Sequence, residues 1–148
     1  MASQTWNWIL SRFYLSLADS HRYFGNRYAN REEHWAAVRN YTRAVSRDPA
    51  YTRAYFSRGL LYWRELGEPE RAVQDLTRVL ELDPGWAEAY FNRAMAHRLI
   101  LDFDQAAADL ERYLEEGSDD FWLDSARRQL EDLRRKPATA DPGEDTQE

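Results

Sequence analysis

The sequence predicts an all-α protein, a solenoid of antiparallel helix pairs, because one motif recurs along the chain. Gly25-x-x-Tyr and Gly59-x-x-Tyr lie 34 residues apart, and the related Ala94-x-x-His follows 35 residues after Gly59. Each motif is followed by Ala-x-x-x and then an aromatic residue or leucine, as Ala37/Tyr41, Ala72/Leu76 and Ala106/Leu110. A period of this length is typical of helix pairs that each cover the apolar face of a neighbour.

Apolar residues within each unit recur at helical spacing, and turn-forming residues separate the segments. In the middle unit one helical face carries Ala72, Val73, Leu76, Val79 and Leu80. Pro49 and Pro84 are expected to end the second helix of a unit, because proline cannot continue the hydrogen-bond ladder. Glycine inside a helix costs about 1 kcal/mol relative to alanine. Gly25 and Gly59 therefore predict helices that cross too closely for a larger side chain.

The middle unit resembles the tetratricopeptide repeat, whose pattern is Trp-x2-Leu-Gly-x2-Tyr, then Ala-x3-Phe, then Pro. The matching motifs are Tyr55-x-x-Arg58-Gly59-x-x-Tyr62, Ala72-x-x-x-Leu76 and Asp83-Pro84. The resemblance implies a right-handed superhelix of three repeats, at about 18–50, 51–86 and 87–120. The first repeat matches least well, because His21 stands where the pattern has tryptophan.

The remaining segments are expected to flank the repeats. Residues 1–17 form an N-terminal aromatic helical extension, 121–135 a C-terminal capping helix, and 136–148 a disordered acidic tail. The middle repeat has one extra residue, which we place in a longer hairpin turn at 65–70.

The frame of the first repeat has two interpretations, and a single long helix over residues 5–31 is possible in both. We prefer the frame on Gly25, because it keeps the 34-residue period without an insertion. The alternative places Ala18 at the glycine position, with about two extra helical turns before Ala37. In either frame the apolar side chains of the N-terminal segment must be covered. We first expect the core of the first repeat to cover them, and the alternative is a dimer interface or a partner. These residues are Trp6, Trp8, Ile9, Phe13 and Tyr14.

Composition narrows the classes of function. The chain has no cysteine, which excludes disulfides, thiolate zinc sites and cysteine nucleophiles. It has no apolar run near the roughly 20 residues that span a bilayer, so we expect a cytoplasmic protein without a membrane span. Residues 1–64 hold 10 arginines and 4 acids, a net charge of +6, whereas residues 65–148 hold 10 basic residues and 22 acids, a net charge of −12. This gradient would steer an acidic partner to the N-terminal half or favour head-to-tail contact between copies. Nucleic acid is not an expected partner of an acidic chain.

Enzymatic motifs are not found. His21, His34 and His97 fall in separate predicted helices without metal-ligand spacing, and no phosphate loop or nucleophile elbow occurs. We therefore expect no catalysis, no metal and no cofactor.

In the tetratricopeptide family, the first helix of each repeat lines a concave groove. Carried onto this sequence, the groove positions are Asp19, Arg22, Tyr23, Asn26, Ala29, Asn30, Arg53, Phe56, Ser57, Leu60, Trp63, Arg64, Glu88, Phe91, Asn92, Met95, Arg98 and Leu99. Ten of them are predicted to bind a peptide with acidic and apolar residues: Arg22, Asn26, Arg53, Phe56, Ser57, Trp63, Arg64, Phe91, Asn92 and Arg98. Some relatives clamp a chaperone's C-terminal carboxylate with basic residues, but here Glu88 and Asn92 occupy the places of the last two, so this clamp is not predicted.

The sequence therefore predicts a protein-interaction module, an adaptor or scaffold. Two alternatives stay open. One is a small client-specific chaperone, since the chain resembles the acidic three-repeat chaperones of bacterial secretion systems in size and charge. The other is a self-assembling repeat protein that forms homo-oligomers through its N-terminal segment.

Overall fold

The computed structural model describes residues 2–135, which form seven α-helices and one π-helical turn. The first pair is α1 (Ala2–Tyr28) with α2 (Arg31–Arg47). In the second pair, α3 (Thr52–Leu61) continues into the π-helical turn η1 (Tyr62–Leu66) and packs against α4 (Pro69–Leu82). The third pair is α5 (Ala87–Leu99) with α6 (Phe103–Glu116), and α7 (Asp120–Arg134) follows.

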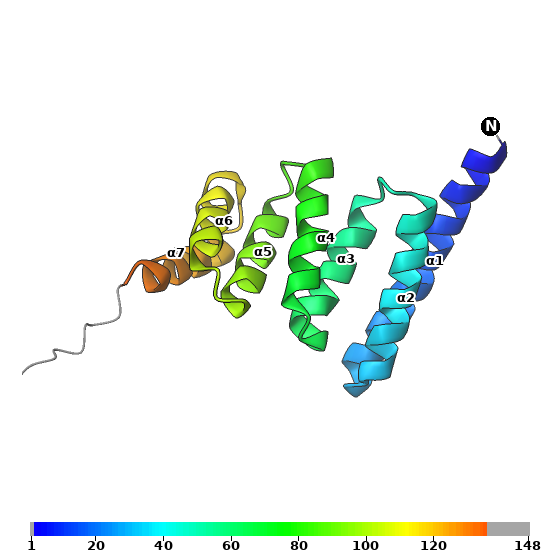
Figure 1. The fold of residues 1–148 in the computed structure, drawn as a ribbon, viewed down its shortest axis with the longest axis horizontal. Coiled ribbons are helices and arrows are strands. Elements are labelled where there is room, and N and C mark those ends of the chain that lie inside the picture. Colours follow the sequence, from blue (N-terminus) through cyan, green and yellow to red (C-terminus); the bar gives the residue numbers. More distant parts are fainter. Residues whose placement is uncertain (1, 136–148) are drawn as a thin grey trace, which may run out of the picture.

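These helices stand in one row, with α1 and α7 at opposite ends (Figure 1). Contacts run mainly between helices that are consecutive in the chain, and the described part contains no strand. The predicted all-α solenoid of antiparallel helix pairs is therefore confirmed. A helix is present where the capping helix is expected, whereas the tail predicted for 136–148 lies outside the described residues.

Helix ends lie where the local chemistry favours them. Asn30, Asp102 and Asp119 precede α2, α6 and α7, and each side chain accepts a hydrogen bond from a backbone N–H of the first turn. These bonds satisfy donors that a helix start leaves unpaired. Pro69 opens α4, where its missing N–H has no cost.

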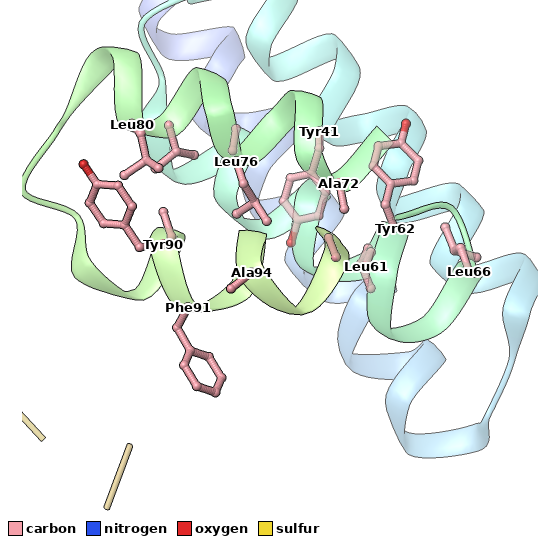
Figure 2. Close-up of a cluster of buried hydrophobic side chains, with 14 of the residues drawn as sticks. Tyr41, Leu61, Tyr62, Leu66, Ala72, Leu76, Leu80, Tyr90, Phe91 and Ala94 are labelled. Atoms are coloured by element: carbon pink, nitrogen blue, oxygen red, sulfur yellow. The ribbon is translucent and has the colours of Figure 1, made fainter. Parts of the chain in front are cut away.

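The core is a continuous cluster of side chains from all the helices. Tyr41, Leu76 and Leu110, at corresponding positions of the three units, are fully buried; Figure 2 shows Leu76 within this cluster. A Cβ placed on Gly59 would lie 3.1 Å from Leu76 Cγ, and one on Gly25 would overlap the His34 ring. The close approach predicted at both glycines is therefore present.

In each later unit an arginine forms a buried ion pair within its own unit and a hydrogen bond to the unit before it. Arg58 of α3 donates two hydrogen bonds of 2.7 Å to Asp75 of α4. Its third nitrogen donates to Thr42 of the preceding α2, at 2.8 Å. The third unit repeats the arrangement, as Arg93 with Asp109 and Thr77 at 2.6–3.0 Å.

The extra residue of the middle unit lies in the helix and not in the turn. It falls between Gly59 and Ala72, and the chain absorbs it as the π-helical turn η1. Only Gly67 and Glu68 separate η1 from α4, the same number of residues as between α1 and α2. Gly67 has φ of 71°, a left-handed conformation that glycine adopts without strain. The expected longer turn is therefore wrong, because widening one helical turn keeps the tight connection.

The frame on Gly25 is also wrong. It places Tyr28 in the position of Tyr62, which is buried, but Tyr28 is 70% exposed. The single long helix is present, since α1 runs without interruption for 27 residues.

Contacts of α1 with α2 favour the alternative frame, with Ala18 at the close crossing. Ala18 is fully buried, and the adjacent Asp19 accepts a hydrogen bond of 2.6 Å from the hydroxyl of Tyr41. Tyr41 is the counterpart of Leu76, which packs at Gly59. The two frames differ by seven residues, about two helical turns. Both therefore turn the same side of α1 toward the predicted groove.

The N-terminal aromatic residues do not pack into the first unit's core, contrary to our first expectation. The exposed fractions are 42–63% for Trp6, Trp8, Ile9 and Phe13, and only Tyr14 packs against the core. The physical reason is that α2 covers a single side of α1. That side carries the buried residues Ser11, Leu15 and Ala18.

Stability should fall as the pH drops through the range in which histidine titrates in the unfolded chain. His97 is buried, and burial lowers its pKa, although the negative charges of Asp109 and Asp102 act to raise it. Below about pH 6.5 the unfolded histidine therefore binds a proton that the folded one does not bind, which favours unfolding. We expect the urea midpoint to decrease between pH 7.5 and 5.5, and to decrease less in His97→Phe. An unchanged slope in that variant would contradict this role.

Candidate binding groove

Two adjoining pockets open along the first helices of the units and share Phe56, Leu60 and Arg64. Together they are called the groove. The basic pocket has a volume of about 380 Å³ and is lined by Arg22, Asn26, Arg53, Phe56, Ser57, Leu60, Leu61, Arg64, Glu65 and Trp86. The apolar pocket has a volume of about 200 Å³ and is lined by Phe56, Leu60, Arg64, Glu88, Phe91, Asn92, Tyr113 and Trp122.

Eight of the ten predicted binding residues line the groove: Arg22, Asn26, Arg53, Phe56, Ser57, Arg64, Phe91 and Asn92. Trp63 and Arg98 line neither pocket. Trp63 packs against the core, and its buried Nε1 has no hydrogen-bond partner among the described residues. The Arg98 guanidinium approaches Met95 Sδ at 4.0 Å. Partner binding by the other eight stays a prediction.

Asp19 engages two arginines of the basic pocket. Its carboxylate lies 3.1 Å from Arg53 and 3.7 Å from Arg22, and it accepts a hydrogen bond of 2.6 Å from the Tyr41 hydroxyl. Burial and this carboxylate raise the pKa of Tyr41, which therefore remains a donor at neutral pH. A carboxylate from a partner would compete with Asp19 for these two arginines.

Arg64 bonds an amide instead of a carboxylate. It donates a hydrogen bond of 2.9 Å to Asn92 Oδ1, and Asn92 Nδ2 donates one of 2.7 Å to the Glu88 carbonyl. Partial burial lowers the pKa of Arg64, although the negative charge of Glu65 acts to raise it. Arginine nevertheless keeps its charge at neutral pH. Both polar groups of Asn92 are therefore used, and Asn92 positions Arg64. Because Arg64 bonds an amide and not a carboxylate, it is the cation best placed to meet a partner's carboxylate.

Asn26 retains a free donor. Its Oδ1 lies 2.9 Å from His34 Nε2, so Nε2 is the protonated nitrogen of that ring and donates to Asn26. The amide NH2 of Asn26 is then available to a carbonyl in the basic pocket. Ser57, a further predicted residue, supplies a hydroxyl to the same pocket.

Aromatic rings in tilted or edge-on contact shape the apolar pocket. Phe91 lies 5.3 Å from both Tyr113 and Trp122, measured between ring centroids. Phe56, which lines both pockets, lies 5.1 Å from Trp86 of the basic pocket. The sequence did not predict Trp86, Tyr113 and Trp122 as groove residues. Trp122 belongs to the apolar face of the capping helix α7, and no local pattern indicates that this face contacts α5.

No group of three or more histidine, aspartate or glutamate side chains within residues 2–135 could hold a metal ion. No helix in that range is long and apolar enough to cross a membrane.

The helix pairs and the groove along their first helices define a helical-repeat protein. The family model for the tetratricopeptide repeat matches residues 24–85 and 64–121. The chain therefore belongs to the tetratricopeptide repeat family. No curated protein matches the sequence.

Solved structures share the fold. The OM64 TPR domain of Arabidopsis is 23% identical, with a TM-score of 0.72 over 88% of this chain and 99% of that one. The second TPR domain of human RPAP3, in complex with the HSP70 peptide SGPTIEEVD, is 23% identical, with a TM-score of 0.65 over 82% and 98%. The Yersinia enterocolitica type III secretion chaperone SycD, in complex with a peptide of the translocator YopD, is 15% identical, with a TM-score of 0.69 over 82% and 90%. At these identities the similarity concerns the fold.

Proposed function

We propose that this chain is a protein-interaction module, an adaptor or scaffold in the cytoplasm, that holds an extended segment of a partner protein in the groove. The observation that carries the proposal is the adjacency of the basic and the apolar pocket, which share Phe56, Leu60 and Arg64. A segment with a carboxylate close to a large apolar side chain would occupy both pockets at once. The module needs neither catalysis nor a cofactor.

The chemistry of the basic pocket favours an acidic ligand. Arginine pairs with a carboxylate through two parallel hydrogen bonds, and Arg53 and Arg64 are both exposed. Asn26 and Ser57 add neutral groups that can bond an extended backbone. The expected dissociation constant is around 1 μM, which corresponds to about −8 kcal/mol.

Relatives support the class of ligand. The RPAP3 domain was solved with a peptide whose sequence places acidic residues beside valine, and SycD was solved with a peptide of a translocator. The present chain departs from a carboxylate clamp at Glu88 and Asn92, so we do not propose the chaperone C-terminus itself as the ligand.

An array of synthetic peptides tests the proposal. We expect the wild type to retain peptides that combine acidic and aromatic residues, in preference to peptides in which the acidic residues are replaced by lysine. Arg53→Ala/Arg64→Ala should weaken that binding at least ten-fold, because the two exposed cations of the groove are removed. Fluorescence anisotropy with the best labelled peptide gives the dissociation constants.

Arg39→Ala/Arg128→Ala is the matched control, since both arginines are exposed and neither lines the groove. It removes the same charge and should bind as the wild type does. Equal losses in both variants would mean that only net charge matters. A preference for the lysine peptides would contradict the proposal.

A client-specific chaperone is the second candidate, favoured by the similarity to SycD and by the aromatic lining of the apolar pocket. In that case binding should depend on Phe91 more than on Arg53. Phe91→Ala and Arg53→Ala, compared with the same peptides, distinguish the two functions.

A further inference from the structure

One face of α1 carries exposed apolar side chains along almost its whole length. Intervals of three, four or seven residues place them on one side of the helix. The members of this α1 stripe are Trp6, Ile9, Phe13, Leu17, Phe24 and Tyr28. Their exposed fractions run from 36% at Leu17 to 70% at Tyr28. Exposed apolar surface of this extent usually marks an interaction site, and here only Ser20 and His21 interrupt it, between Leu17 and Phe24.

The later units show what kind of element covers this face. Leu17 immediately precedes Ala18, the residue at the close crossing of α1 with α2. Arg58 and Arg93 occupy the same position in the other two units. Both arginines contact the second helix of the preceding unit, Arg58 through Thr42 and Arg93 through Thr77. Inside the chain, this face therefore packs against a helix. On α1, a helix from another molecule would take that place.

We propose that the α1 stripe packs against the α1 stripe of a second copy, antiparallel, with the two-fold axis at Leu17. The two ends of the stripe are symmetric about this residue, because Trp6 lies eleven positions before it and Tyr28 eleven after it. Phe24 is matched by the half-buried Leu10 beside the stripe, whereas Ile9 and Phe13 are matched by Gly25 and His21. A two-fold axis therefore sets Trp6 against the partner's Tyr28 at both ends of the contact.

The surface is large enough for a specific dimer. At about 150–250 Å² for each large side chain, the exposed fractions of the stripe leave roughly 600 Å² of apolar surface on each copy. Pairing would remove about 1,200 Å² in total, which is the lower end of specific interfaces. Burial of this area is expected to outweigh the loss of rotational and translational freedom only if the stripes pack closely.

Charge sets the orientation of the pair. Beside the stripe lie Arg27 and His21, and His21 is paired with Glu33 at 2.7 Å. A parallel pair would bring the two Arg27 side chains together. In the antiparallel pair they stand about 30 Å apart, ten residues from the axis in opposite directions. That separation exceeds the screening length of about 8 Å at physiological salt.

A head-to-tail assembly fits the structure less well, although the charge gradient of the sequence favours it. The element at the other end of the row is α7, and its exposed residues are mostly charged. They include Asp124, Arg127, Arg128, Glu131, Asp132 and Arg134, although Phe121 and Trp122 in its first turn are exposed as well. Apart from Phe121 and Trp122, such a face would offer the aromatic rings of the stripe no large exposed apolar side chain.

Sedimentation equilibrium tests the dimer. We expect twice the chain mass of 17.6 kDa, unchanged in 1 M salt because the contact is apolar. Leu17→Arg/Phe24→Arg should raise the dissociation constant of the dimer at least ten-fold, while Phe103→Arg/Phe121→Arg should leave it unchanged. All four residues are exposed in the monomer, so circular dichroism should show intact folding. A wild-type monomer, or a mass that grows with concentration beyond the dimer, would overturn the proposal.

Cross-linking tests the geometry, since the chain has no cysteine of its own. Leu17→Cys should form a disulfide-linked dimer on mild oxidation, because facing side chains at a helix contact meet the distances that a disulfide needs. Trp6→Cys should not link to itself but should link to Tyr28→Cys when the two variants are mixed. Arg39→Cys, exposed on α2, is the control for random collision. Self-linking of Trp6→Cys would instead show a parallel pair and overturn the antiparallel arrangement.

Discussion

Replacing Arg58 with alanine should lower the free energy of unfolding by about 3–5 kcal/mol, the usual cost of removing one partner of a buried ion pair. The Asp75 side chain is only 8% exposed, and Arg58 supplies two hydrogen bonds of 2.7 Å to it. Burial already raises the pKa of Asp75, although the positive charge of Arg58 acts to lower it. Without the guanidinium the carboxylate would remain buried and unpaired. Urea unfolding at pH 7, followed by circular dichroism, measures the change.

Two further variants decide whether the buried charge is the cause. Arg78→Ala removes an arginine that pairs with Glu81 at an exposed site, and it should cost within about 0.5 kcal/mol. Arg58→Met/Asp75→Leu replaces both partners with apolar side chains and should recover most of the loss. The deficit of Arg58→Ala should also shrink as the pH falls toward 4, because an unpaired buried carboxyl then becomes neutral. A deficit that is the same at all pH values would indicate lost packing instead.

Residue spacing was enough to predict the repeats, because the features that define them are local. Gly59 indicates a close helix crossing, Pro49 and Pro84 indicate helix ends, and the recurring alanine and leucine positions indicate one buried face. Each of these depends on helical periodicity and on the covalent chemistry of single residues. The groove positions followed from the resemblance to the tetratricopeptide repeat, in which the first helix of each repeat lines the groove.

The residues that pack opposite a given helix face could not be predicted from the sequence. The pairing of Asp19 with Arg53 joins residues 34 positions apart, and no local pattern indicates it. The frame of the first unit failed for a related reason. Gly25 and Ala18 are two turns apart on the same side of α1, and only tertiary features distinguish them, namely the contact with Tyr41 and the exposure of Tyr28. The N-terminal aromatic residues have helical spacing, but spacing does not indicate that α2 covers the other side.

Replacing Leu76 with alanine should lower the free energy of unfolding by about 2–5 kcal/mol, because the side chain is fully buried at the centre of the array. Figure 2 shows it on α4 with Ala72 and Leu80 in the same cluster. Leu101→Ala, at a residue that is 72% exposed, should change the free energy by no more than about 0.5 kcal/mol. Equal losses in the two variants would contradict the burial argument.

The same site allows a test of why residue 59 is glycine. In the wild type, a Cβ at this position would lie 3.1 Å from Leu76 Cγ and 3.3 Å from Asp75 Cβ, so Gly59→Ala should be destabilising despite the higher helix propensity of alanine. In the Leu76→Ala background the nearer atom is gone, and Gly59→Ala should cost less or become stabilising. Urea unfolding of the two single variants and the double variant gives the coupling energy. Strictly additive effects would mean that the glycine serves some purpose other than the close approach to Leu76.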